Sequence, residues 1–98
     1  MTFRLILVDE ASAALKTLKY TPHLSVQFKA VSKALVLLQN NPRHPSLQTH
    51  KYHAMAGPEG QEVFEAYAQQ DTPGAYRVFF YYGPGRVEIT VFAIVPHP

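Results

Sequence analysis

The strongest constraint on the fold lies in the last quarter of the chain, where two runs of β-branched and aromatic residues flank a short break. The runs are Tyr76–Tyr82 and Arg86–Val95, and the break between them is Gly83-Pro84-Gly85. Side chains of these types favour extended backbone, whereas glycine and proline interrupt it. The pattern therefore predicts a β-hairpin that belongs to a larger sheet.

The alternation of side chains in this hairpin predicts its two faces. The odd-numbered residues of Val87–Val95 are apolar and should face the core. A four-residue connection that pairs Tyr81 with Arg86 sets Arg77 beside Thr90, whereas a three-residue connection buries an unpaired guanidinium, which is costly. We therefore expect a second face that is half aromatic and half polar, made of Arg77, Phe79, Tyr81, Glu88, Thr90 and Phe92.

Upstream of the hairpin, the sequence predicts three further strands and two helices. Short apolar or alternating runs favour strands at Phe3–Val8, Gln48–Ala54 and Glu62–Ala68. A first helix should begin near Glu10. A second helix should end before Pro42, because the residue before proline disfavours helical backbone. Its apolar residues recur at spacings of four, three, four and three and form one face: Leu24, Phe28, Val31, Leu35 and Leu38.

This order of elements predicts an α+β fold. We expect an N-terminal strand and a two-helix antiparallel hairpin packed on one face of a mainly antiparallel sheet of four to five strands. With 98 residues, the range 1–98 should form a single domain. The sheet face without helices is then the expected functional face.

The charged residues are distributed unevenly along the chain. Residues 1–57 carry seven lysines and arginines against two acidic residues, whereas residues 58–98 carry two against five. A basic first half suits a polyanion such as nucleic acid. Ordinary solubilising lysines on helices are the alternative interpretation.

The composition also bears on cofactors and on location. Cysteine is absent, which rules out disulfides and thiolate metal sites. His50 and His53 are three residues apart and should point to opposite faces of a strand, so no metal site is expected. The apolar run near the start is too short for a signal peptide or a membrane span. We expect a cytoplasmic protein with no cofactor and no membrane contact.

Four segments, taken in order, resemble the RelE/ParE superfamily, the toxins of bacterial toxin–antitoxin modules. They are the helix Leu24–Leu38 followed by Asn41-Pro42, the segment Pro45–Tyr52, the run Ala75-Tyr-Arg-Val-Phe-Phe80 and the terminal Ile94-Val-Pro-His97. The resemblance covers nearly the whole chain and implies a RelE-like fold. It also implies either a ribosome-dependent messenger-RNA endonuclease or, in the ParE branch, an inhibitor of DNA gyrase. Both are normally silenced by an antitoxin protein.

For the nuclease branch, the resemblance implies metal-free cleavage of ribosome-bound message. The ribose 2′-hydroxyl then attacks the adjacent phosphate, which requires a base, an acid and a cation for the phosphate oxygens. Arg77 suits the cation role, and His97 resembles the C-terminal acid/base residue of that branch. Lys51 and Glu65 would share the base and positioning roles. The alternatives are an ion pair of Arg77 with Glu88 or Glu65, and a frayed terminal histidine.

The expected substrate-binding residues are basic or aromatic: Arg43, His50, Tyr67, Phe79 and Tyr81. The basic residues would grip a phosphate backbone, and the aromatic ones would stack bases or receive an amphipathic antitoxin helix. A plain solvated edge and core beneath a further helix are the alternatives. The second functional hypothesis is a non-catalytic protein-binding module that acts as the gyrase inhibitors do. A third is a homodimer formed through the aromatic face.

Overall fold

The structure is a computed structural model that describes residues 2–97. Within this range the chain forms two α-helices, five strands and two short 3₁₀ turns, which lie at Pro22–Leu24 and Pro45–Leu47. The helices and strands follow in this order: β1 (Arg4–Leu7), α1 (Asp9–Tyr20), α2 (Ser25–Asn40), β2 (His50–Ala56), β3 (Glu62–Tyr67), β4 (Tyr76–Tyr82) and β5 (Glu88–Pro96).

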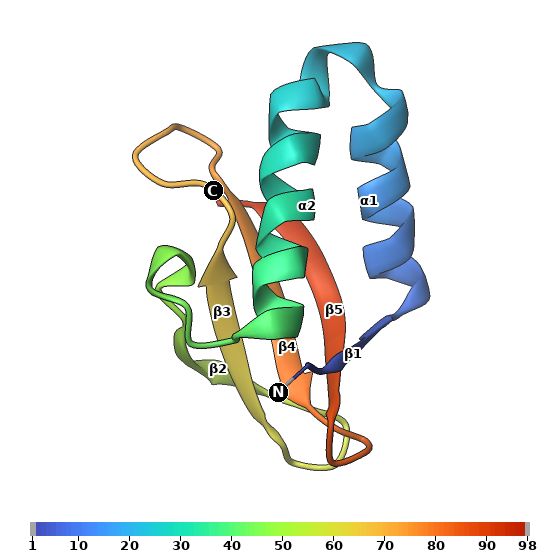
Figure 1. Ribbon diagram of the computed structural model, residues 1–98, viewed down its shortest axis with the longest axis vertical. Helices are drawn as coiled ribbons and strands as arrows, with labels where there is room; N and C mark the ends of the chain where they lie inside the picture. Colours follow the sequence, from blue (N-terminus) through green and yellow to red (C-terminus); the bar gives the residue numbers. More distant parts are fainter. Residues whose placement is uncertain (1, 98) are drawn as a thin grey trace.

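The five strands form one sheet in the order β1-β5-β4-β3-β2 (Figure 1). β1 pairs with β5 in parallel, and the other neighbouring strands are antiparallel. The two helices run antiparallel to each other against the same face of the sheet, and no α-helix of residues 2–97 covers the opposite face. The predicted α+β architecture is therefore confirmed.

α2 buries the periodic face that the sequence predicts. The residues of this stripe are buried or pack against the core: Leu24, Phe28, Val31, Leu35 and Leu38. The same hydrophobic cluster contains Phe80 of β4 and Val91 of β5, which are both fully buried. Burial of one such side chain contributes roughly 1.5–3 kcal/mol, so the stripe holds α2 on the sheet. The helix ends before Pro42, as predicted, with the Asn41 N–H bonded to the Leu37 carbonyl at 2.7 Å.

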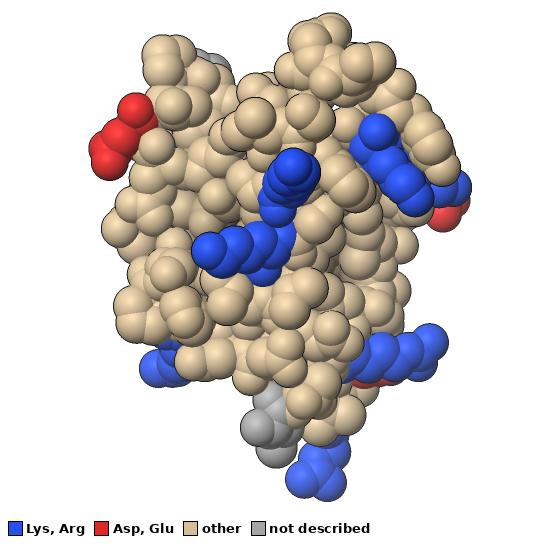
Figure 2. Space-filling view, turned by 45° about the horizontal axis from the view of Figure 1, so that its top comes forward, with Lys and Arg blue, Asp and Glu red and all other residues tan. Residues whose placement is uncertain are grey.

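The lysines of the two helices lie on the helix side of the molecule and are exposed to solvent. α1 carries Lys16 and Lys19, and α2 carries Lys29 and Lys33, all of them exposed. Figure 2 shows the lysine and arginine side chains of this side spread out singly or in pairs, with mostly uncharged surface between them. Neither helix is long and apolar enough to cross a membrane within residues 2–97.

The register of the β4–β5 hairpin differs from the predicted one. The connection between the strands is Gly83–Val87, which is longer than either connection considered from the sequence. As a result Tyr81 pairs with Thr90 rather than with Arg86. This shift is an even number of residues, so near the turn it leaves each side chain on its expected face.

Side-chain contacts close this longer turn. The Glu88 carboxylate accepts a hydrogen bond from the Gly85 N–H at 2.8 Å, and the Thr90 hydroxyl donates one to the Gly83 carbonyl at 2.8 Å. Gly83 has a φ of +112°, which a residue with a Cβ rarely adopts. The predicted loop length was wrong because the alternation of apolar residues carries no information about these side-chain hydrogen bonds in the turn.

A β-bulge lies farther along the hairpin, at Phe92. Phe79 pairs with Ala93, whereas the next residue, Phe80, pairs with Val91, so Phe92 is the extra residue of β5. One extra residue moves every later side chain of the strand to the opposite face of the sheet.

The bulge reverses part of the predicted core. Ile94, expected on the outer face, is only 3% exposed, and Val95, expected in the core, is 41% exposed. Val87 was also expected in the core but lies in the turn and is 46% exposed. Arg77 lies opposite Val95 instead of Thr90.

β2 is an outer strand of the sheet, and its side chains alternate between two environments. Lys51 pairs with Phe64, whose ring packs against the core, so Lys51 lies on the helix side. His50 pairs with Glu65 on the opposite side. Directly opposed residues of antiparallel strands share a face. Neighbouring residues of β2 therefore serve different surfaces.

Candidate active site

A small cleft lies on the helix-free side of the sheet, where β4 begins and β5 ends. Its volume is about 180 Å³, and it collects side chains from four strands and the residue after β5: Tyr52, Glu65, Arg77, Phe79, Val95, Pro96 and His97. Three of the four residues expected from the sequence to be catalytic line this cleft together. The fourth, Lys51, does not line it.

The Arg77 guanidinium is built into the wall of the cleft. Its Nη1 donates to the carbonyls of Gln69 at 2.9 Å and Ala75 at 3.3 Å, with a longer contact to that of Tyr76 at 3.5 Å. Its Cζ lies 3.8 Å from the centroid of the Tyr67 ring, and the side chain is 11% exposed. These contacts hold the guanidinium in place beside the cleft.

The Glu65 carboxylate lies between two cationic or hydrogen-bonding partners. Its Oε2 is 3.6 Å from the Nε of Arg77, and its Oε1 is 2.9 Å from the Nε2 of His50. The sequence left open whether Glu65 or Glu88 would pair with Arg77. The structure pairs Arg77 with Glu65, whereas Glu88 pairs with Arg4 at 3.1 Å. The 3.6 Å separation is an ion pair without a hydrogen bond, and the buried Nε has no acceptor among the described residues.

His50 connects the edge strand to this carboxylate. Its Nδ1 lies 3.0 Å from the Gln48 carbonyl, and its ring meets the Tyr67 ring edge-on with centroids 5.6 Å apart. With Nε2 on Glu65, both ring nitrogens face oxygen atoms. The ring therefore fixes the direction of the Glu65 carboxylate. A direct contact of this ring with substrate, as expected from the sequence, would require it to leave these partners.

His97 reaches the cleft through the bulge in β5. Its N–H donates to the Ala75 carbonyl at 2.8 Å, which extends the β4–β5 pairing by one residue. Val95 lies opposite Arg77, and alternate residues of a strand share a face, so His97 lies on the face of Arg77. Without Phe92 as an extra residue, the same alternation would direct His97 to the helix side.

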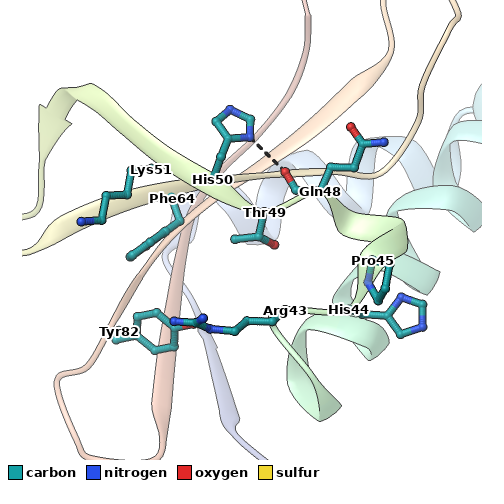
Figure 3. Close-up of a pocket in the computed structure, with 9 residues that line it drawn as sticks. All are labelled: Arg43, His44, Pro45, Gln48, Thr49, His50, Lys51, Phe64 and Tyr82. Atoms are coloured by element: carbon teal, nitrogen blue, oxygen red, sulfur yellow. Dashed lines mark hydrogen bonds between the residues drawn. The ribbon is translucent and has the colours of Figure 1, made fainter.

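Lys51 and Arg43 lie outside the cleft. The Lys51 Nζ is 3.0 Å from Glu62 Oε2, and both lysine and arginine line a separate hollow on the helix side of β2 (Figure 3). The prediction that Lys51 shares one cleft with Arg77 and His97 was therefore wrong. The physical reason is the alternation of β2, which places Lys51 on the face opposite to that of its neighbour His50.

The predicted aromatic residues occupy different positions around the cleft. Phe79 lines it and packs edge-on against Tyr52, with ring centroids 5.0 Å apart. Tyr81 lies one alternate position farther along β4, where its ring approaches that of Phe92. Tyr67 lies against the guanidinium. The sequence analysis missed Tyr52, although its position two residues after His50 in a strand is a signal for the same face.

No group of three or more histidine, aspartate or glutamate side chains within residues 2–97 is arranged to hold a metal ion. The cleft instead offers one guanidinium, one carboxylate and one imidazole. These are a fixed positive charge, a proton acceptor and a group that can donate or accept a proton.

No protein-family model matches the sequence, and no curated protein matches it. Among solved structures, the chain is similar to one in the crystal structure of an archaeal RelE–RelB complex from Pyrococcus horikoshii OT3. The two chains are 18% identical, the alignment covers 98% of this chain and 96% of the other, and the TM-score is 0.64. The chain therefore has the RelE-like fold that its four sequence segments predict.

Proposed function

We propose that this protein is a metal-independent endoribonuclease that cleaves messenger RNA on the ribosome and is silenced by an antitoxin protein. The observation that carries the proposal is the cleft that brings Arg77, Glu65 and His97 together. These residues come from β4, β3 and the end of β5, which lie far apart in the sequence. Their side chains supply the three functions that cleavage of a ribose phosphate requires.

Each residue has one role in the proposed reaction. The ribose 2′-oxygen attacks the adjacent phosphorus while Glu65 accepts its proton, and His97 donates a proton to the leaving 5′-oxygen. The products are a 2′,3′-cyclic phosphate and a 5′-hydroxyl. Arg77 binds the phosphate oxygens, on which negative charge accumulates in the transition state.

The contacts around the cleft support this assignment, because they hold the reacting groups before substrate arrives. Backbone carbonyls fix Nη1 of Arg77, and His50 holds one oxygen of Glu65 at 2.9 Å. Groups that are already oriented cost no reorganisation during the reaction. We assign positioning roles to His50 and Tyr67, and base-stacking roles to Phe79 and Tyr81 beside the cleft.

An antitoxin partner is part of the proposal. A solved structure with the same fold is that of a RelE–RelB complex, which supports a protein partner for this chain as well. The proposed substrate is ribosome-bound message, so we place the activity in the cytoplasm.

Inducible expression tests the nuclease. We expect the unaltered protein to arrest growth and to produce messages with new 5′-hydroxyl ends, and His97→Ala to abolish both. His97 is exposed and its backbone contact survives this substitution, so the variant should fold. His23→Ala is the matched control, because His23 is also exposed but lies in the turn between the two helices. Cleavage that persists at the same sites in His97→Ala would contradict the proposed role.

A non-catalytic, protein-binding role is the second candidate. The observation in its favour is the engagement of Arg77, which is 11% exposed and already bonded to backbone carbonyls. In this case growth arrest occurs without new 5′-hydroxyl ends, or no arrest occurs, and Glu65→Gln and His97→Ala behave like the unaltered protein.

A further inference from the structure

A second hollow, larger than the cleft, lies on the helix side of β2. Its volume is about 400 Å³. It opens between the loop after α2 and the side chains of β2, β3 and β4 (Figure 3), and its lining residues are Arg43, His44, Pro45, Gln48, Thr49, His50, Lys51, Phe64 and Tyr82. None of these residues is acidic. The hollow is therefore a positively charged concave surface that the proposed chemistry does not use.

Both cations of the hollow are available to a ligand. Arg43 forms no ion pair with any residue in the range 2–97 and is exposed. Lys51 pairs with Glu62, but the two side chains are 54% and 62% exposed. Such exposed pairs contribute little to stability, so a phosphate can replace Glu62 at small cost.

Tyr82 adds an aromatic ring and a hydrogen-bond donor to the same wall. Burial raises the pKa of Tyr82 above its usual value of 10.0, and the positive charge of Arg43 opposes this rise. The phenol is therefore protonated at neutral pH and lies within the field of the guanidinium. The Tyr82 ring also meets Phe64 edge-on, with centroids 5.4 Å apart.

We propose that this hollow binds the backbone of single-stranded RNA, with Arg43 and Lys51 on phosphate oxygens and Tyr82 against a base. Basic groups beside aromatic rings are the usual means of holding single-stranded nucleic acid. An acidic peptide would meet the same cations, but it packs on the ring wall only where it carries an apolar or aromatic side chain, whereas every nucleotide of RNA carries a base that can stack. The identity of the nucleic acid rests on the proposed function.

The position of the hollow favours one strand of RNA that touches both sites. Within β2, Tyr52 lines the cleft and Lys51 lines the hollow, whereas His50 lines the hollow and bonds Glu65 of the cleft through its ring. Only the edge strand separates the two surfaces. An extended RNA that crosses β2 can therefore contact the hollow with one part and the cleft with another.

The salt dependence of binding tests the proposal. A labelled oligouridylate is titrated with the His97→Ala protein, which prevents cleavage, and affinity is followed by fluorescence anisotropy at several salt concentrations. Adding Arg43→Gln and Lys51→Gln should reduce the slope of log K against log salt by about 1.4, since each phosphate contact on a single strand contributes about 0.7. Adding Lys29→Gln and Lys33→Gln to the same background removes the same charge from α2 and should leave the slope unchanged.

A third variant tests the opposite direction. Glu62→Gln frees Lys51 from its pair and should strengthen RNA binding in the same assay, whereas Glu59→Gln, an exposed acidic residue in the β2–β3 turn, should have a smaller effect. An unchanged or weaker affinity of Glu62→Gln argues against Lys51 as a phosphate ligand.

Three results would overturn the proposal. The first is absence of RNA binding at low salt, and the second is an equal loss of slope in the α2 control. The third is that poly-glutamate of equal charge binds the protein and that Arg43→Gln and Lys51→Gln reduce its salt slope as much as they reduce that of RNA. The last result would assign the hollow to an acidic peptide. If the protein binds RNA through the hollow but never cleaves message, the proposed nuclease activity is wrong and the RNA-binding hollow is still supported. The failures of the two proposals are therefore distinguishable.

Discussion

The cleft and the hollow differ in how their charges are held. In the cleft, Arg77 and Glu65 are each 11% exposed, and their polar atoms contact each other, His50 or backbone carbonyls. In the hollow, Lys51 is 54% exposed and Arg43 has no ion pair within residues 2–97. Buried, mutually paired charges are rigid and nearly neutral as a group, whereas exposed cations attract anions from solution. The two surfaces are therefore suited to chemistry and to capture, respectively.

A single edge strand separates these two environments. β2 has one open side in the sheet order, and its alternate residues contribute to one surface or the other. The difference teaches that residues adjacent in sequence can belong to separate functions. Lys51 and Tyr52 illustrate this directly, since Lys51 lines the hollow and not the cleft, whereas Tyr52 lines the cleft and not the hollow.

The largest expected effect separates catalysis from capture. His97→Ala should lower the rate of message cleavage in a translation extract by roughly 10²–10⁴-fold, the usual contribution of a general acid, without changing the KM. The double variant Arg43→Gln/Lys51→Gln should instead raise KM and leave kcat unchanged. If both variants alter the same kinetic parameter, the two surfaces do not have separate roles.

The two arginines should differ in their effect on folding. Arg77→Ala removes a buried guanidinium and leaves Glu65 without its counter-charge, so the free energy of unfolding should fall by about 3 kcal/mol. Arg43→Ala, at an exposed position, should change it by no more than about 0.5 kcal/mol. Urea unfolding followed by circular dichroism measures both. Equal losses would show that Arg43 is as firmly built into the fold as Arg77.

The two glutamates of β3 form a similar pair. Glu65→Gln should lower the free energy of unfolding by about 2 kcal/mol, because it removes the charge that Arg77 and His50 face in a buried setting. Glu62→Gln breaks only the exposed pair with Lys51 and should change the same quantity by less than about 0.5 kcal/mol. The same urea titration compares them, and a larger loss in Glu62→Gln would reverse the contrast.

The smallest effect concerns the ionisation of Tyr82. Arg43 opposes the rise that burial causes, so Arg43→Gln should raise the pKa of Tyr82 further. A raised folded-state pKa stabilises the protein below pH 10.0, and this contribution is lost as pH rises through the folded-state pKa. The variant should extend that loss to higher pH. Carbon-13 NMR of the tyrosine ring follows the titration, with Lys33→Gln as a control that removes a charge from α2.

Local sequence patterns predict the helices and strands well. The apolar stripe of α2 and the end before Pro42 follow from spacing and from proline geometry, and both are confirmed. The β4–β5 pairing does not follow, because it depends on the Glu88 carboxylate at the turn and on the bulge at Phe92. Neither feature changes the alternation of apolar residues near the turn, so periodicity cannot detect them.

The membership of the cleft was predictable only in part. Arg77 and Glu65 lie on neighbouring strands, and their alternation alone places both on the helix-free face. The position of His97 depends on the bulge, which inverts the end of β5. The family resemblance places Lys51 with them, although the alternation with His50 indicates the opposite face.

The parallel pairing of β1 with β5 has a consequence for the order of events during synthesis. Arg4 and Glu88 form a side-chain contact although 84 positions separate them. β5 is the strand with which β1 pairs in the sheet. Contacts between such distant residues form late, and a nascent chain whose β5 is still inside the ribosomal exit tunnel has no partner for β1. The molecule can therefore mature only after β5 has emerged.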